Sequence, residues 1–157
     1  MPMRIESFLK QSPIFQANRM ARRMDAALAE ILTGEELSVF EAMVLVAIFF
    51  EKRGEIKPSE LAVAFQTTRG NVSHCVSSLE AKGLVERRID PDDARGFQLM
   101  LKPPGRRRAV RVVGILDRIQ RQLEETVGVA TLESMLKQLG QVEELCVGFA
   151  SVRRDSS

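Results

Sequence analysis

Side chains that form hydrogen bonds are concentrated between Thr67 and Ser77, a stretch that contains neither Asp nor Glu. At 100° per residue, a helix here has one apolar face and a small, polar opposite face. The apolar face consists of Val72, Cys75, Val76 and Leu79. A helix that enters the DNA major groove needs small residues for close approach and polar groups for base edges. The stretch therefore predicts a DNA-recognition helix, whose best base or phosphate contacts are Thr68, Arg69, Asn71, Ser73 and His74, with Ser77 on the same face.

Each of these side chains also has an ordinary structural alternative. Thr67 and Thr68 are good residues to cap a helix that starts at Arg69. Asn71 can bond the backbone, and Arg69 at the flank suits a phosphate better than a base. His74 is the single histidine of the chain, and a lone histidine does not predict a metal site.

Basic residues gather in the stretch that follows this helix. Nine Lys or Arg and four acids lie between Lys82 and Arg111, which gives this stretch a net charge of about +5 in a chain of net charge +2. The basic residues are Lys82, Arg87, Arg88, Arg95, Lys102, Arg106, Arg107, Arg108 and Arg111. A basic stripe on a nearly neutral protein is typical of a DNA-binding face. The alternative is a solvated surface laced with salt bridges.

The elements that must position these residues follow from periodicity and from capping signals. Ser12-Pro13 starts a helix that ends near Gly34, and Ser38 caps a second, mostly apolar helix to about Lys52. A short helix opens at Pro58, and the recognition helix ends at Gly83. A period of two then predicts strands at 84–89 and 97–102 around a loop at 90–96. A long helix follows Pro103-Pro104-Gly105, a hinge lies at 128–131, and a last helix begins at Leu132.

This order predicts a mainly α fold with a small β-hairpin wing. We expect a single domain over 1–157, with a winged helix-turn-helix unit at 34–102 and dimerisation helices at 1–33 and 103–157. The apolar stripes of the outer helices are too long for the small central unit to cover, so a partner subunit is the simple solution. An intramolecular helical bundle would leave the wing pattern unexplained.

Composition argues against several other classes of protein. Cys75 and Cys146 are far apart and no CxxC pair exists, so the chain has too few ligands for a structural zinc site without carboxylates. Met1–Gln11 lacks the apolar core of a signal peptide, and the longest apolar run, residues 42–50, is too short to span a bilayer. We therefore expect a cytoplasmic protein without membrane segments, metal or cofactor. No nucleophile–base pair or carboxylate cluster predicts catalytic residues, so an enzyme is not expected.

Two runs of residues carry a resemblance to a known family. Residues 79–87 read Leu-Glu-Ala-Lys-Gly-Leu-Val-Glu-Arg, and residues 90–95 read Asp-Pro-Asp-Asp-Ala-Arg. Together with Pro58–Ala62, Leu101 and Gly105, they resemble the signature of the MarR family of bacterial transcription regulators. The resemblance spans nearly the whole chain and is sharpest at residues 58–105. The chain departs from the family pattern at Lys102, where a capping Thr is usual, and in the additional acid Asp92.

The resemblance implies a homodimeric repressor, with interleaved first and last helices, that binds a pseudo-palindromic duplex. It implies that Arg95, at the wing tip, reaches the minor groove or its phosphates and that Asp93 orients it. It places His74 at a position where family members read bases. It also implies that Arg87 either holds the start of the first wing strand or binds a phosphate. Arg88 is the remaining basic candidate of the wing.

The resemblance also implies a small-molecule effector that releases the DNA. Its candidate pocket residues are Met20, Met24, Phe40, Val44, Ile48 and Leu116, although the sequence favours an ordinary core role for each of them. Two other functions stay open. One is a redox-responsive regulator that uses Cys75 or Cys146, although both cysteines fall on apolar faces. The other is a protein-binding winged-helix adaptor, which predicts acids or apolar residues on the exposed face of the recognition helix.

Overall fold

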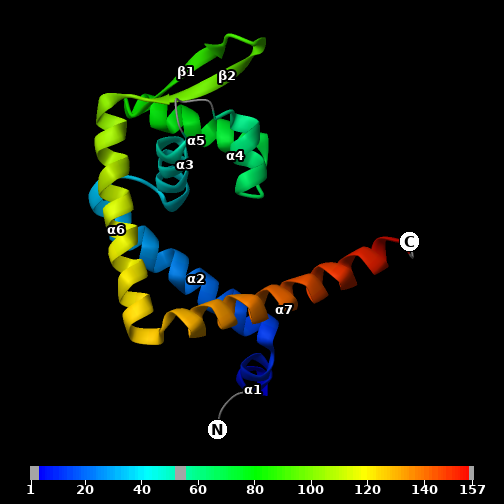
Figure 1. Ribbon diagram of the computed structural model, residues 1–157. Coiled ribbons are helices and arrows are strands. Elements are labelled where there is room, and N and C mark those ends of the chain that lie inside the picture. The colour runs from blue at the N-terminus through cyan, green and yellow to red at the C-terminus, as the bar shows by residue number, and fades with distance from the viewer. Residues whose placement is uncertain (1–3, 52–55, 156–157) are drawn as a thin grey trace. The chain divides into compact units, whose positions relative to one another are not determined.

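The computed structural model describes residues 4–51 and 56–155, with the side chains of 94, 95 and 153–155 left out. Seven helices, one short 3-10 turn and two strands follow one another in the described part of the chain (Figure 1). They are α1 (Arg4–Gln11), α2 (Pro13–Leu32), η1 (Thr33–Glu35), α3 (Val39–Phe50), α4 (Pro58–Ala64), α5 (Arg69–Ala81), β1 (Val85–Asp90), β2 (Asp93–Leu101), α6 (Pro103–Val127) and α7 (Val129–Asp155). The expected mainly helical fold with a β-hairpin wing is confirmed.

The chain divides into two compact units, which are described separately. One unit is Arg22–Leu116, and the other joins Met1–Ala21 to Asp117–Ser157. The first contains the helix-turn-helix and the hairpin, with a core to which its α-helices and both strands contribute. The side chains buried most completely are Leu32, Val44, Leu45, Leu61, Val72, Val76, Leu79, Leu84, Val85, Leu99 and Val112.

Helix boundaries in this unit follow local capping chemistry. Ser38 caps α3 as expected: its Oγ accepts the N–H of Glu41, and the Glu41 carboxylate accepts the N–H of Ser38 at 2.8 Å. The left-handed residue after α2 is Glu36, with φ of 55°, and not Gly34. The chain first forms the 3-10 turn η1 and reverses only after it. The expected helix end at Lys52 lies outside the described residues.

Gly83 ends α5 in the manner its position predicts. Its φ is +70°, and the N–H of Leu84 bonds the carbonyl of Leu79 while the N–H of Gly83 bonds that of Glu80. This pair of bonds is a Schellman motif, which requires a left-handed residue and therefore favours glycine. The motif turns the chain directly from α5 into β1.

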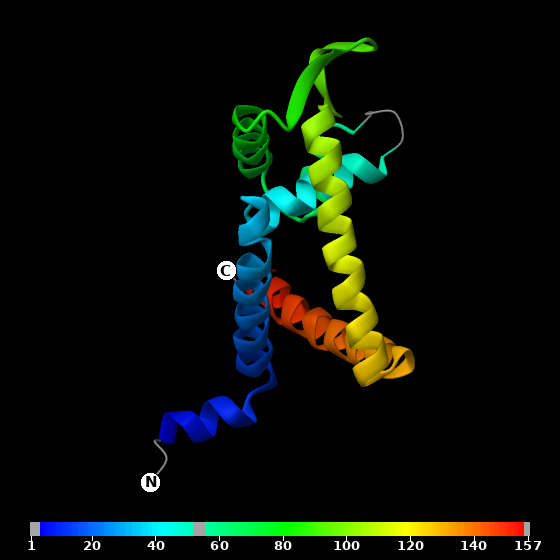
Figure 2. The ribbon, with the colours of Figure 1, turned by 90° about the vertical axis from the view of Figure 1, so that its left-hand side faces the viewer.

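The hairpin differs from the expectation at its tip. β1 and β2 pair antiparallel in regular register up to Ile89 opposite Phe97; the register then shifts, and Asp90 pairs with Asp93. The turn is therefore Pro91-Asp92, and residues 94–96 of the expected loop are additional residues of β2 at this irregularity. The carboxylate of Asp90 accepts the N–H of Asp92 at 3.0 Å, which closes the tight turn. The backbone of Arg95 accordingly lies within β2 and not at the tip, and its side chain is outside the described part. The hairpin projects beyond the helices of its unit (Figure 2).

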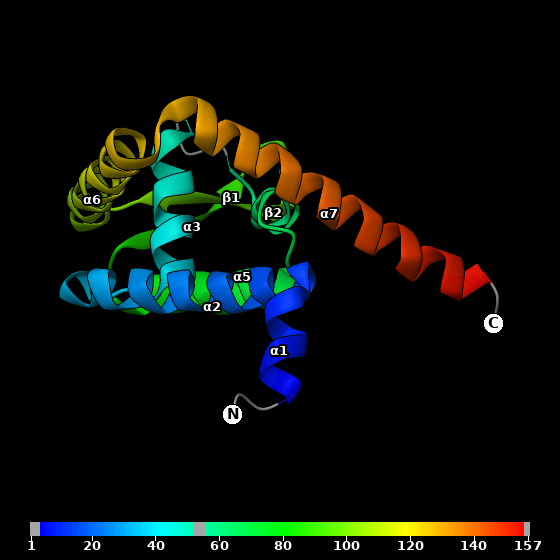
Figure 3. The same ribbon diagram turned by 90° about the horizontal axis from the view of Figure 1, so that it is seen from below.

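The second unit buries little apolar surface within one chain. None of the described side chains of α1 or α7 is buried, and α7 is one continuous helix (Figure 3). Gly128, with φ of +91°, separates α6 from α7, so the break is shorter than the expected hinge at 128–131. Exposed large apolar residues of this unit include Ile5, Phe8, Phe15, Met135, Leu136, Leu139, Leu145, Phe149 and Val152.

Candidate nucleic-acid interface

The two faces of α5 lie as its sequence predicts. Val72, Val76 and Leu79 are fully buried and Cys75 is 5% exposed. The opposite face is solvent-exposed and carries no carboxylate over its first two turns. It presents Thr68, Arg69, Asn71, Ser73, His74 and Ser77, while Thr67 is half-buried in the preceding turn. The face therefore offers small side chains with both donors and acceptors to any ligand that approaches it.

The start of α5 is fixed by its threonines, as the structural alternative proposed. The Oγ1 of Thr68 accepts the N–H of Asn71 at 3.1 Å, so Thr68 is the N-cap. The Nδ2 of Asn71 donates to the Oγ1 of Thr67 at 2.9 Å. These contacts order the exposed Asn71 amide before any ligand arrives, which lowers the entropy that binding would cost.

Arg87 ties β1 to α5. Its guanidinium pairs with the carboxylate of Glu80 and donates to the backbone oxygen of Ser73 at 3.2 Å and to the Oγ of Ser77 at 3.1 Å. Glu80 also accepts the backbone N–H of Arg87 at 3.0 Å. Of the two roles expected for Arg87, holding the start of the strand is the one these contacts describe. The same contacts place a cation beside the polar face of α5.

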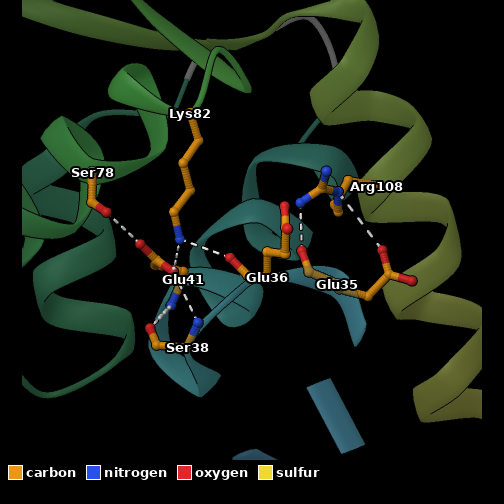
Figure 4. Close-up of polar contacts among 7 residues, drawn as sticks. All are labelled: Glu35, Glu36, Ser38, Glu41, Ser78, Lys82 and Arg108. Atoms are coloured by element: carbon orange, nitrogen blue, oxygen red, sulfur yellow. Dashed lines mark hydrogen bonds and ion pairs between the residues drawn. The ribbon is translucent and has the colours of Figure 1, made fainter. Parts of the chain in front are cut away.

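A buried carboxylate holds α5 against α3 (Figure 4). Glu41 is 7% exposed and accepts hydrogen bonds from the Oγ of Ser78 at 2.5 Å and the Nζ of Lys82 at 2.8 Å. Lys82 also donates to the backbone oxygen of Glu36 at 2.8 Å. Burial raises the pKa of Glu41, but the bonds from Lys82, Ser78 and the Ser38 N–H outweigh it, so the pKa lies below its usual range. The carboxylate is therefore charged at neutral pH, and it fixes how α5 lies on the core.

Glu41 was missed in the sequence, although a signal for it exists. The spacing Ser38-x-x-Glu41 is that of a capping box, which would have identified the N-terminus of α3. Its pairing with Lys82, 41 residues away, has no local signal.

Much of the basic stretch is paired within the protein. Arg111 lies 3.0 Å from the carboxylate of Glu35, and Arg108 pairs with the same residue at 3.7 Å. Arg88 pairs with Glu86 at 2.5 Å while remaining exposed. The guanidinium of Arg106 lies over the ring of Phe49, 5.7 Å from its centre. The salt-bridged alternative thus describes a large part of this stretch. Within the described residues, Lys102 and Arg107 are exposed and have no carboxylate at ion-pair distance.

The six residues expected to line an effector pocket differ in exposure. Val44 and Ile48 are core residues, Phe40 and Leu116 pack against that core, and Met20 and Met24 are 53% and 61% exposed. The four inner side chains therefore have the core role that the sequence also allowed. The effector pocket itself stays a prediction.

The thiol of Cys75 is buried and poorly reactive. Burial, with the charge of Glu41 as a further cause, raises the pKa of its thiol to about 11. Cys146 is half-buried on α7 and is likewise a free cysteine. Because the thiolate is the reactive form, Cys75 has few of the features of a redox sensor.

This burial predicts slow alkylation of Cys75 in the native protein. At pH 7 we expect iodoacetamide to label it far more slowly than in urea, because only about one thiol in ten thousand is ionised at a pKa near 11. Mass spectrometry of peptides quenched over time measures the rates, with Cys146 as internal reference. Fast native labelling that abolishes DNA binding in the wild type but not in Cys75→Ser would instead support the redox function.

None of the helices that the structure describes is both long and apolar enough to cross a membrane. No group of three or more His, Cys, Asp or Glu residues in the part of the chain that the structure describes is arranged to hold a metal ion.

A family model, curated relatives and solved structures each match part of the chain. The family model described as "MarR family" matches residues 43–97, from α3 to the wing. The transcriptional repressor MprA of Escherichia coli (strain K12) is 29% identical over 91 residues, which are 55% of this chain and 52% of MprA. The chain thus spans about half the length of the curated relatives it matches.

Solved structures match over a longer stretch. The Staphylococcus aureus MepR–DNA complex superposes with a TM-score of 0.77 at 19% identity, covering 85% of this chain and 97% of that one. CouR of Rhodococcus jostii RHA1, bound to p-coumaroyl-CoA, gives a TM-score of 0.72 at 20% identity, covering 85% and 93%. At these identities the likeness establishes the fold.

Proposed function

We propose that the chain is a MarR-family winged helix-turn-helix transcriptional regulator, as the family model over residues 43–97 supports, and that it is a homodimeric repressor that binds pseudo-palindromic duplex DNA. The observation that carries this proposal is the exposed, carboxylate-free face of α5. Exposed helices usually carry mixed charges for solubility. A face of small polar residues with one flanking arginine suits the major groove.

On this proposal α5 enters the major groove with its N-terminal half. His74 and Asn71 read base edges, and Ser73 and Ser77 line the close approach. Arg69, exposed at the first position of α5, neutralises a phosphate, and the exposed hydroxyl of Thr68 donates a hydrogen bond to one. The two copies of α5 in a dimer would read half-sites about one helical turn apart.

The wing supplies the second contact. The family signature assigns Arg95 to the minor groove, where a narrow groove concentrates negative potential and attracts arginine. Asp93, exposed at the start of β2, would orient that arginine. Arg88 is exposed on β1 and adds a cation to the same hairpin.

A binding assay with two substitutions tests the proposal. Fluorescence anisotropy against duplexes from the gene's own upstream region, at several salt concentrations, is the measurement. Arg95→Ala should weaken binding about tenfold on every sequence and reduce the salt slope by about one, because it removes one phosphate contact. His74→Ala should weaken the preferred duplex most and leave non-specific binding unchanged. An unchanged salt slope would refute the first role, and equal losses on all duplexes would refute the second.

The exposed apolar faces of the second unit support dimerisation. Monomers rarely leave so many large apolar side chains in water, and two copies of α1 and α7 could cover one another. We expect sedimentation equilibrium to give twice the 17.6 kDa of the chain. Leu139→Asp with Leu145→Asp should shift the protein towards monomer. A wild-type monomer at micromolar concentration would contradict the assembly.

A small-molecule effector is the remaining part of the proposal. The CouR structure contains a bound acyl-CoA. That relative is consistent with a MarR-type repressor that releases DNA when it binds a ligand. The exposed Met20 and Met24 are the two predicted pocket residues still available to a ligand.

A cytoplasmic location would follow from binding the chromosome. The adaptor alternative gains no support, since the polar face of α5 has neither carboxylates nor large apolar side chains over its first two turns.

A further inference from the structure

The two residues just before α4 are bonded to both strands of the hairpin. The backbone oxygen of Ile56 accepts the N–H of Leu99 in β2 at 3.1 Å, and both side chains are buried. The Nζ of Lys57 lies 2.7 Å from the Oδ2 of Asp90, the last residue of β1. The start of the helix-turn-helix and the outer end of β1 are therefore joined by a direct contact.

Asp90 is built into the fold from several sides. Its side chain is 2% exposed, and its other oxygen accepts the backbone N–H of Asp92 at 3.0 Å and lies 3.5 Å from the Nε2 of Gln98. A buried carboxylate is costly unless it is paired and hydrogen-bonded. Lys57, whose side chain is 39% exposed, supplies the positive charge that pairs with this carboxylate. The bond to Lys57 lowers the pKa of Asp90, and the same bond raises the pKa of Lys57, so both groups are charged at neutral pH.

We propose that Lys57 and Asp90 are a positioning pair, which holds the wing against the helix-turn-helix in the orientation that DNA binding requires. This rests on the proposed function. The hairpin projects beyond the helices of its unit (Figure 2), so its outer part has few other supports. The pair attaches the hairpin at the residue before the turn, where a small change in angle would displace β2 and Arg95 most.

A simpler role for Lys57 would be a direct phosphate contact. The two roles predict opposite effects for Asp90→Asn. If Lys57 binds phosphate, removing the neighbouring negative charge frees the lysine and strengthens DNA binding. If the pair positions the wing, the same change weakens binding, although the protein as a whole becomes more positive.

The matched control is Asp92→Asn. It removes the same charge from the same turn, but Asp92 is exposed and its backbone N–H, not its side chain, makes the bond to Asp90. Charge alone therefore predicts equal effects for the two substitutions, and the positioning role predicts that only Asp90→Asn weakens binding.

The experiment is anisotropy titration of the full-length chain with the upstream duplex at several salt concentrations. We expect Asp90→Asn and Lys57→Met each to weaken binding by up to about tenfold and to lower the salt slope by no more than Arg95→Ala does, because the contact they misplace is that of Arg95, and the double variant to bind no more weakly than either. In an Arg95→Ala background neither should have a further effect, because the pair acts through the wing. Lys57→Arg keeps the cation and should bind within about twofold of the wild type, which separates loss of the pair from misfolding.

The outcomes distinguish this inference from the function on which it rests. Wild-type protein that binds no duplex overturns the proposed function itself. Wild-type binding with unweakened Asp90→Asn, or a Lys57→Met effect that adds to that of Arg95→Ala, overturns the positioning role alone.

Discussion

Gly105→Ala is expected to destabilise the chain by about 3 kcal/mol or more, a large part of the stability of an ordinary domain. A Cβ on Gly105 would lie 1.9 Å from the backbone oxygen of Leu84 and 2.8 Å from its carbonyl carbon. The backbone of Leu84 cannot move aside in the way that the end of a flexible side chain can. The same oxygen accepts the N–H of Lys102 at 3.0 Å, so moving it also breaks the connection from β2 to α6.

Urea denaturation followed by circular dichroism measures this effect. Gly34→Ala is the matched control, because no atom lies within 4 Å of the added Cβ and the φ of Gly34 is unstrained. We expect its free energy of unfolding to stay within about 0.5 kcal/mol of the wild type. Equal unfolding midpoints for the two variants would contradict the close approach at Gly105.

Glu41→Ala should cost about 2–3 kcal/mol of stability at neutral pH, since it removes a buried charged acceptor of three hydrogen bonds. It should also alter the pH dependence. The pKa of Glu41 in the folded chain lies below the ordinary value of 4.5. Its contribution is therefore fully present above the pKa of the unfolded chain and is lost as the pH falls through the folded pKa.

The measurement is the free energy of unfolding in urea between pH 7 and pH 3. The gap between the wild type and Glu41→Gln should narrow as the pH falls through the folded pKa of Glu41. Glu36→Gln is the control, because Glu36 is an exposed acid next to the same lysine and contributes only its backbone oxygen. A wild type and a Glu41→Gln variant with parallel pH profiles would show that the carboxylate carries no such linkage.

The features that the sequence predicted correctly depend on short-range signals. The polar and apolar faces of α5 follow from a period of 3.6 residues, and the caps at Ser38, Thr68 and Gly83 follow from residues that act within one turn. Those local signals were sufficient to predict the order of the helices and the presence of the hairpin.

The features that the sequence did not reveal depend on partners distant in the chain. Glu35 pairs with Arg108 and Arg111 more than 70 residues later, so a stretch that reads as free basic charge is partly neutralised. The turn at Pro91-Asp92 was read as a longer loop because turn-forming residues continue to Gly96, while the bond from Asp92 to Asp90 closes it early. Whether the polar face of α5 meets DNA is a property of the complex, which one chain does not contain.

Three elements converge on one residue, Leu84. Its N–H closes the end of α5, its oxygen receives Lys102 before α6, and Gly105 packs on that oxygen. Because these contacts join the recognition helix, the wing and the first turn of α6, we expect the three elements to move together. An effector that altered the spacing between half-sites would therefore be expected to move the recognition helix together with the start of α6.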